Sequence, residues 1–244
     1  MSLPIPYPQR NLTDSESAGA RDEASLRGLL CHIGRQLHEA AWLSGTAGSL
    51  SARLDAAHLL LTPPQLAKGF LQPDQLLKIA FEDALNAQEG EARLHALCYQ
   101  RRPDLNGILF ATPPNAIALT LADISMRTCV LPEAIILLGL VPTAAYSAPF
   151  SAEQCEAIRV LIAQHDALLI AHSGALTVGA DLWEAFLRME VLEHTATVLG
   201  RAAQLAPLPT LPPHEVARLL SLRRQRGYWR EGDAERFCQM CGVC

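Results

Sequence analysis

No stretch of this sequence is apolar over enough residues to cross a membrane. The longest apolar runs span residues 135–138 and 167–171, whereas a membrane-spanning helix needs roughly 20 apolar residues. The polar, proline-containing residues 1–17 also lack a basic start followed by an apolar run, so they do not match a secretory signal. We therefore expect a cytoplasmic protein without membrane contacts.

Long basic runs are missing outside residues 218–230, and the net charge is −5. Nucleic acid is therefore not an implied partner. The seven cysteines are odd in number, and Cys31, Cys98, Cys129 and Cys155 lie singly within apolar or amphipathic segments. Single cysteines of this kind usually behave as small hydrophobic residues. This usage favours reduced thiols over a disulfide framework.

Half of the 244 residues are hydrophobic, which is enough apolar material for one large core and one domain of generous size. The sequence contains no internal repeat and no long interior linker. We expect a flexible leader over residues 1–22 and a main domain over residues 23–204. Residues 205–244 should form a C-terminal helical extension that ends in a cysteine-containing tail.

The spacing of apolar residues predicts helices in alternation with strands. Helices are expected over residues 23–42, 91–101, 113–122, 151–165, 181–196 and 214–225. Strands are expected over residues 49–53, 58–62, 76–81, 106–111, 128–131, 143–146, 167–171 and 176–179. Tight turns join several neighbouring strands, so we expect an α/β fold of the α+β type. Its three layers would be a mixed, mostly antiparallel central sheet flanked by helices.

Five short motifs follow one another along the chain. They are Gly-Thr-Ala-Gly-Ser-Leu-Ser-Ala-Arg at 45–53, Leu-Leu-Thr-Pro at 60–63, Gly-Glu-Ala-Arg-Leu-His at 90–95, Arg-Pro-Asp-Leu-Asn-Gly at 102–107 with Phe-Ala-Thr-Pro-Pro at 110–114, and Ala-His-Ser-Gly-Ala-Leu-Thr-Val-Gly at 171–179. In this order and spacing they resemble the class II aldolase and adducin family, over roughly residues 23–204. The resemblance implies a nine-stranded, largely antiparallel sheet. It also implies a homotetramer with each active site at a subunit boundary.

The resemblance further implies a zinc ion, which in that family is held by three histidines and stabilises an enediolate. The matching positions here are Phe110, Thr112 and Ser173. Phenylalanine cannot ligate a metal, and neutral hydroxyls are poor zinc ligands. We therefore expect no zinc cofactor of the family type. His172, one position before Ser173, is an alternative ligand, although a structural histidine is the favoured interpretation.

Two residues match the family's acid–base groups. Glu91 matches the carboxylate that moves the substrate proton, and Tyr146 matches the tyrosine that protonates the aldehyde oxygen. A buried carboxylate with a raised pKa could act as a general base without a metal. The alternative is that Glu91 only begins a helix, where a negative charge is favourable. His95, one turn later, could pair with Glu91.

The first motif resembles the family's phosphate loop, with glycines that let backbone approach an anion and hydroxyls that donate hydrogen bonds. A plain small-residue turn is the alternative. The positions that we expect to bind a small ligand are Gly45, Thr46, Gly48, Ser49, Thr62, Thr112 and Ser173.

The tail places Cys238, Cys241 and Cys244 at a spacing that suits three thiolates converging on one metal or cluster. The sequence shows no neighbouring fourth ligand, although His214 or another subunit could supply one. Fraying and oxidation of the terminus are the alternative. Residues 223–230 resemble the family's closing segment, where arginine could pair with an anion.

Three functional hypotheses remain open. The first is a class II aldolase-like protein that has lost its metal site and binds a small carbonyl or phosphorylated ligand. The second is a divergent carbon–carbon lyase or isomerase that acts on a sugar phosphate through Glu91 and Tyr146. The third is an interaction module of the adducin type.

Overall fold

A computed structural model describes residues 22–127 and 129–244. The expected leader, residues 1–22, therefore lies outside the described residues except for Asp22. The Asp22 carboxylate accepts hydrogen bonds from the backbone N–H groups of Ala24 and Ser25, and helix α1 (Glu23–Glu39) begins there. No helix in the described ranges combines the length and apolarity of a membrane span.

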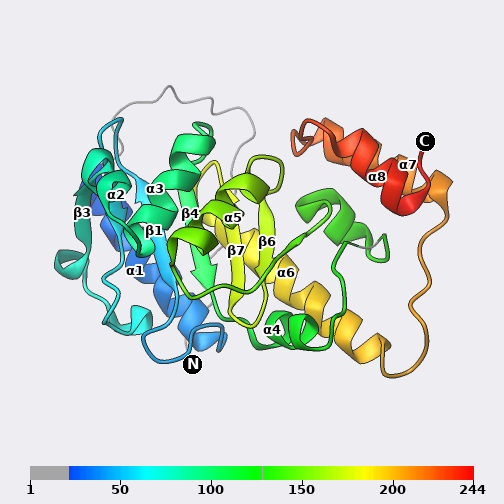
Figure 1. The fold of residues 1–244 in the computed structure, drawn as a ribbon, viewed down its shortest axis with the longest axis horizontal. Helices are drawn as coiled ribbons and strands as arrows, with labels where there is room; N and C mark the ends of the chain where they lie inside the picture. Colours follow the sequence, from blue (N-terminus) through cyan, green and yellow to red (C-terminus); the bar gives the residue numbers. More distant parts are fainter. Residues whose placement is uncertain (1–21, 128) are drawn as a thin grey trace, which may run out of the picture.

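A seven-stranded sheet forms the centre of the described chain (Figure 1), in the order β3-β2-β1-β4-β7-β6-β5. The strands are β1 (Ser49–Arg53), β2 (His58–Leu61), β3 (Leu77–Ala80), β4 (Gly107–Ala111), β5 (Thr143–Ala144), β6 (Ala167–Ile170) and β7 (Gly174–Gly179). Neighbouring strands are antiparallel, except that β5 runs parallel to β6. The mostly antiparallel sheet is confirmed. Within residues 22–127 and 129–244 the sheet has seven strands, instead of the nine that the family resemblance implies.

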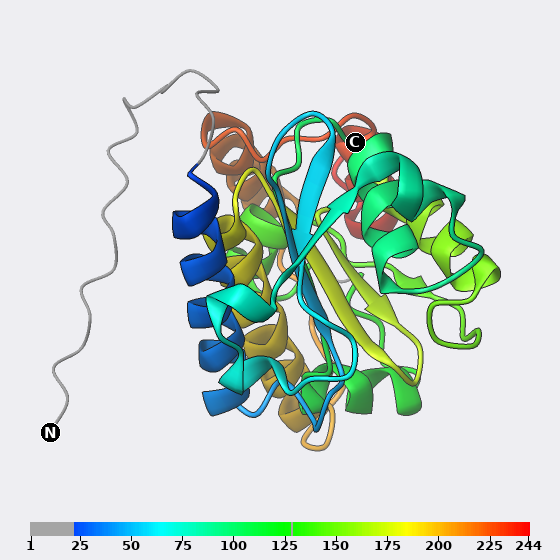
Figure 2. The ribbon, with the colours of Figure 1, turned by 90° about the vertical axis from the view of Figure 1, so that its left-hand side faces the viewer.

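Helices cover both faces of the sheet, which confirms the expected three layers. Figure 2 shows α1 and α6 (Leu182–Ala202), in blue and gold, on one face. The other face carries α2 (Phe81–Asn86), α3 (Glu91–Arg101) and α5 (Ala152–Ile162). The short α4 (Pro114–Leu121) packs against α6. Each face has its own buried apolar cluster, because successive side chains of a strand point to opposite faces.

The expected strand at 128–131 is wrong where the structure describes it. The chain bends at Cys129, and a π-helical turn, η3 (Ala134–Leu138), follows. A short apolar run has no periodicity that separates a strand from a buried helical turn. The other short helical turns, η1 (Lys68–Phe70) and η2 (Pro73–Gln75), lie between β2 and β3.

The C-terminal extension consists of α7 (Pro213–Gln225) and α8 (Asp233–Cys241). In Figure 1 these helices, in orange and red, lie on the opposite side of the molecule from β3. Helix α7 packs on η3, and a third apolar cluster joins the two regions through buried side chains that include Ile135, Val216 and Phe237.

The cysteine pairing corrects the expectation of reduced thiols. Cys129 forms a disulfide with Cys241, and Cys238 forms one with Cys244. The expectation holds for Cys31, Cys98 and Cys155, which are free and buried. The first pair is separated by 112 residues in sequence. Only the packing of α8 against the region before η3 brings its two members together.

Candidate functional site

Three strands meet where β4 ends and where β1 and β7 begin. Ser49 is paired with Phe110, and Ala111 with Ala175. We call this region, formed by residues 46–49, 110–112 and 173–175, the β4 end of the sheet. The start of α3 at residues 90–91 lies beside these three segments. Four segments of the family resemblance that are far apart in the sequence therefore meet here.

Two glycines allow this close approach. Gly48 has a φ of +87°, and a Cβ atom there would lie 2.9 Å from the carbonyl oxygen of Phe110. Gly174 has a φ of +157°, and its Cβ would clash with the carbonyl oxygen of Ala111. Only glycine combines this backbone conformation with this lack of space. Both glycines therefore hold their segments against the end of β4.

Glu91 is the titratable group with the most unusual surroundings at this end. It is the first residue of α3, after Gly90, whose N–H donates to the carbonyl oxygen of Phe150 over 3.0 Å. The Glu91 Oε2 atom is buried and has no hydrogen-bond partner. Burial raises the pKa of Glu91 to about 7, although the positive charge of Lys68 opposes the shift. Near neutral pH this carboxyl group can therefore both accept and release a proton.

Lys68 is a residue that the sequence analysis missed. Its side chain is 1% exposed, and its Nζ donates to the carbonyl oxygens of Thr46 (2.6 Å) and Pro64 (3.0 Å). Burial lowers its pKa. No pattern marks an isolated lysine in a turn-rich segment as buried, so only the tertiary fold reveals it. The lysine fixes the backbone of the candidate phosphate loop and places a positive charge near Glu91.

The three positions that correspond to the family's histidines lie together at the β4 end, with different surroundings. The ring of Phe110 is 6% exposed and packs edge to face on Phe150, with ring centroids 5.4 Å apart. The Thr112 Oγ1 donates to the carbonyl oxygen of Trp42 over 3.3 Å. Ser173 is half-buried in the turn before β7.

Two expected ligand-binding hydroxyls are engaged inside the protein. Ser49 Oγ lies 2.8 Å from His95 Nε2, and Ser51 Oγ lies 2.6 Å from His95 Nδ1. The Thr62 Oγ1 accepts a hydrogen bond from the N–H of Leu50 over 3.0 Å. Burial lowers the pKa of His95 to about 3, so the ring is neutral. The expected pairing of His95 with Glu91 is therefore wrong, because His95 points into the sheet.

His172 and Tyr146 are neighbours at the surface. Their ring centroids lie 5.7 Å apart, and Tyr146 is 62% exposed. The N–H of His172, whose φ is +60°, donates to Thr120 Oγ1 over 3.1 Å. The turn geometry thus sets His172 beside Tyr146, on the outside of the β6–β7 connection.

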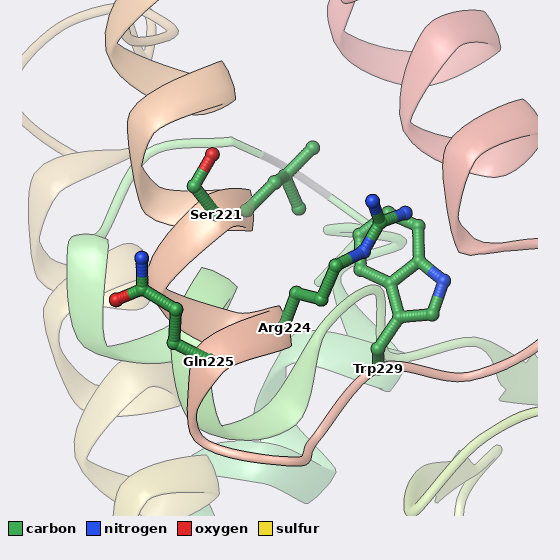
Figure 3. Close-up of a pocket in the computed structure, with 5 residues that line it drawn as sticks. Ser221, Arg224, Gln225 and Trp229 are labelled. Atoms are coloured by element: carbon green, nitrogen blue, oxygen red, sulfur yellow. The ribbon is translucent and has the colours of Figure 1, made fainter.

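The arginine-rich segment is mostly engaged within the chain. Arg223 is buried and donates to Asp233 and to the carbonyl oxygen of Ile136, while Arg230 donates to Asp166. Arg224 instead stacks on Trp229, 4.1 Å from the ring centroid. Figure 3 shows this pair at the edge of a cavity of about 310 Å³, lined by Leu220, Ser221, Arg224, Gln225 and Trp229.

Comparisons with known proteins show similarity in sequence and in fold. The family model of the class II aldolase and adducin N-terminal domain matches residues 28–199. A 3-oxo-tetronate 4-phosphate decarboxylase of Escherichia coli is 27% identical over 209 residues, which are 83% of this chain and 98% of that protein. An L-fuculose phosphate aldolase of Methanococcus maripaludis is 26% identical over 169 residues, 68% of this chain and 90% of that protein.

A solved structure also resembles the fold. The crystal structure of L-fuculose-1-phosphate aldolase from Thermus thermophilus aligns with a TM-score of 0.65 at 26% sequence identity. The alignment covers 77% of this chain and 100% of that chain. The fold of this chain is thus similar to that of a sugar-phosphate aldolase of known structure.

Proposed function

The chain belongs to the class II aldolase and adducin family, and on that premise we propose that it binds a small phosphorylated carbonyl compound at the β4 end of its sheet. We further propose that it does so without zinc of the family type. The observation that carries the binding proposal is the Glu91 carboxyl group, which has a buried, unpartnered oxygen and a pKa of about 7. Buried polar atoms without partners are rare, and a ligand is one explanation for them.

The donor set at the β4 end does not fit zinc. The side chain of Phe110 offers no lone pair and packs on Phe150. The hydroxyls of Thr112 and Ser173 are neutral and weakly basic, so they bind zinc poorly. Only Glu91 offers an anionic oxygen at this place. We therefore assign no step of the proposed chemistry to a metal ion.

The loop over residues 45–49 supports an anionic ligand. Thr46 is exposed, and Gly45 has a φ of +59°, which opens the backbone on the outer side of the turn. The carbonyl oxygens of Thr46 and Pro64 point inward to Lys68. A phosphate group could then receive hydrogen bonds from the outward N–H and hydroxyl groups of the loop.

A second candidate is a carbon–carbon lyase, which the relatives favour because several of them are named as decarboxylases or aldolases of phosphorylated compounds. Both reactions break a carbon–carbon bond and leave an enolate on the carbonyl-bearing fragment. The protonated Glu91 would deliver a proton to that enolate carbon. In an aldol cleavage the Tyr146 oxygen would accept the proton of the hydroxyl group that becomes the aldehyde, and would return it to the aldehyde oxygen in the reverse reaction; a decarboxylation, which releases carbon dioxide from a carboxylate, needs only the proton from Glu91.

Calorimetric titration of chelator-treated protein with dihydroxyacetone phosphate and with inorganic phosphate tests the binding proposal. We expect binding to persist in chelator and to weaken by about tenfold in Thr46→Val, since a hydrogen bond to a charged group contributes about 1.5–3 kcal/mol. Thr143→Val is the matched control, because Thr143 is an equally exposed threonine on the edge strand β5.

Two outcomes would count against the proposal. Binding that disappears with chelator and returns with Zn²⁺ would mean that a metal is required. Equal losses in Thr46→Val and Thr143→Val would remove the loop from the binding site. Release of carbon dioxide or an aldehyde from a phosphorylated sugar acid or ketose, lost in Glu91→Gln, would favour the lyase over a binding protein.

A further inference from the structure

Four cysteines gather at one place in the C-terminal half of the chain, away from the β4 end. Cys129 precedes η3, Cys238 and Cys241 lie on α8, and Cys244 is the last residue. The Cα atoms of Cys129 and Cys241 are 6.1 Å apart, and those of Cys238 and Cys244 are 4.7 Å apart. We call this group the four-cysteine cluster.

Helix α8 holds one cysteine of each disulfide and so links the two pairs. Cys238 and Cys241 are three residues apart on α8, so their side chains emerge on the same face of the helix. Gly242, with a φ of +67°, ends the helix, and its N–H donates to the carbonyl oxygen of Cys238 over 3.0 Å. This left-handed turn brings Cys244 back to Cys238. The two disulfides are therefore joined through neighbouring positions on one face of α8.

Cys129 and Cys241 lie in apolar surroundings, whereas Cys238 is half-buried and Cys244 is exposed. Cys129 is 1% exposed and belongs to the buried cluster formed with residues such as Ile135, Leu140 and Phe237. Cys241 and Val243 pack against the same cluster. An apolar shell of this kind shields sulfur ligands from water and from competing ligands.

We propose that the four-cysteine cluster is a binding site for a thiophilic metal, either a zinc ion or an iron–sulfur cluster, and that the two disulfides are its oxidised, metal-free form. Four thiolates arranged around one point are typical of zinc and of iron–sulfur centres. Three cysteines at Cys-x-x-Cys-x-x-Cys spacing with a fourth from elsewhere match the ligand pattern of such clusters. Cys129 is the fourth ligand that the tail lacks.

The conversion between the two forms balances. Each disulfide takes two electrons and two protons from a dithiol reductant, which itself becomes a disulfide. The four thiols then lose four protons on binding Zn²⁺, leaving a four-thiolate centre with a net charge of −2. Within residues 22–127 and 129–244 the structure, in which these four cysteines form two disulfides, contains no group of three or more His, Cys, Asp or Glu side chains that could hold a metal ion. The proposed site therefore requires reduction of both disulfides.

Positive charge lies near the cluster. Arg127 and Arg236 each stand two residues before a cysteine of the cluster, and the Nε atom of each is buried without a partner. Burial, then the charges of Arg236 and Arg127, lower the pKa of His165 to about 4, so both guanidinium groups lie in one neighbourhood. The Arg236 guanidinium also pairs with Asp233 over 2.8 Å, so Arg127 is the group whose charge could offset part of the negative charge of a thiolate centre.

Elemental analysis of the full-length chain tests the site. The protein is produced without a polyhistidine tag and purified without oxygen in a dithiol reductant. We expect about one zinc ion per chain, or iron with acid-labile sulfide and broad visible absorption, which distinguishes the two metals. Reduced, metal-free protein titrated with Co²⁺ should develop the intense visible bands of tetrahedral sulfur ligation.

Cys244→Ser and Cys129→Ser should each abolish these signals, while Cys31→Ser and Cys155→Ser should retain them, because Cys31 and Cys155 are buried outside the cluster. Cys244→Ser changes an exposed residue beyond the end of α8, so it remains informative if Cys129→Ser fails to fold, as judged by circular dichroism. Reduced protein that alkylates fully yet takes up no zinc, iron or Co²⁺ would overturn the proposal. Uptake that survives Cys244→Ser would also overturn it. Neither outcome depends on phosphate binding at the β4 end.

Discussion

Glu91 and His95 lie one turn apart on α3, but their side chains differ in hydrogen bonding. His95 is fully buried, and both ring nitrogens have serine partners. Glu91 is less buried but has an oxygen with no partner. A buried polar group that has its hydrogen-bond partners stabilises the fold, whereas one without a partner lowers the free energy of unfolding. This difference supports a structural role for His95 and the proposed ligand-binding role of Glu91.

Replacing Glu91 with glutamine should stabilise the protein at high pH. The pKa of Glu91 is raised by burial from 4.5 to about 7, so the native state binds the proton more tightly than the unfolded chain. The free energy of unfolding therefore falls as pH rises from about 4.5 to 7 in the natural protein, but not through this site in Glu91→Gln. After allowance for solvent screening, we expect the variant to be more stable by about 1–2 kcal/mol at about pH 8.

Urea unfolding of both proteins at about pH 5 and about pH 8 measures this difference. Glu89→Gln is the control, because Glu89 is exposed in the turn just before α3. A stability difference for Glu91→Gln that is the same at both pH values would contradict the raised pKa.

Gly174→Ala should destabilise the β4 end. An added methyl group would clash with the carbonyl oxygen of Ala111, and the φ of +157° is strained for alanine. We expect a loss of about 2–4 kcal/mol in the free energy of unfolding. In Gly28→Ala no atom lies within 4 Å of the added methyl group, so this helical control should gain about 0.5–1 kcal/mol. Equal effects of the two changes would show that the close approach at Gly174 is absent.

At the scale of elements, Asp166 joins four separate parts of the chain. It lies just before β6 and is fully buried. Its carboxylate pairs with Arg102 after α3, with Arg188 on α6 and with Arg230 before α8. Burial alone would raise its pKa, but the three guanidinium groups outweigh burial and hold the pKa at about 2. One carboxylate thus ties both faces of the sheet to the C-terminal extension.

Asp166→Asn should cost about 3 kcal/mol at neutral pH, because two buried arginines, Arg102 and Arg188, and the partly buried Arg230 would lose their shared negative partner. The pKa of Asp166 is lower in the native state than in the unfolded chain. Its stabilisation is therefore present above pH 3.8 and is lost as pH falls towards about 2. The gap between the natural protein and Asp166→Asn should accordingly close in acid, as measured by urea unfolding. Asp123→Asn, in an exposed turn, is the control. A gap of constant size would contradict the assignment.

At the scale of the whole molecule, the proposed ligand site and the proposed metal site lie in different parts of the fold. The β4 end lies at the middle strands of the sheet, while the four-cysteine cluster fastens α8 to the region before η3. The C-terminal helices pack on η3 and lie away from β3 (Figure 1). Loss of a metal from the cluster would therefore loosen the extension without dismantling the central sheet.

The homotetramer implied by the family resemblance stays a prediction. Light scattering coupled to size exclusion should give a particle of four chains. Exposed apolar residues such as Leu121 and the ring of Tyr146 would then be buried between subunits. Tyr146→Glu should shift the particle towards smaller species, whereas Leu205→Glu, at another exposed apolar position, serves as the control. A monomer at micromolar concentration would contradict the prediction.

The sequence by itself determined the family, the order of most elements and the positions that meet at the β4 end. These follow from local rules: the periods of strands and helices, and motifs that retain their spacing. Gly48 and Gly174 belong to this group, because glycine marks a backbone constraint that is visible in a motif.

Only the tertiary structure decided which polar side chains are buried and which of them have hydrogen-bond partners. The burial of Lys68, the unpartnered oxygen of Glu91 and the position of Cys129 beside the tail depend on segments that are far apart in the chain. Burial and charge act through space rather than along the sequence, so no local pattern specifies them. For the same reason the short apolar run after Thr128 has the sequence pattern of a strand, although its packing against α7 and α8 gives it another conformation.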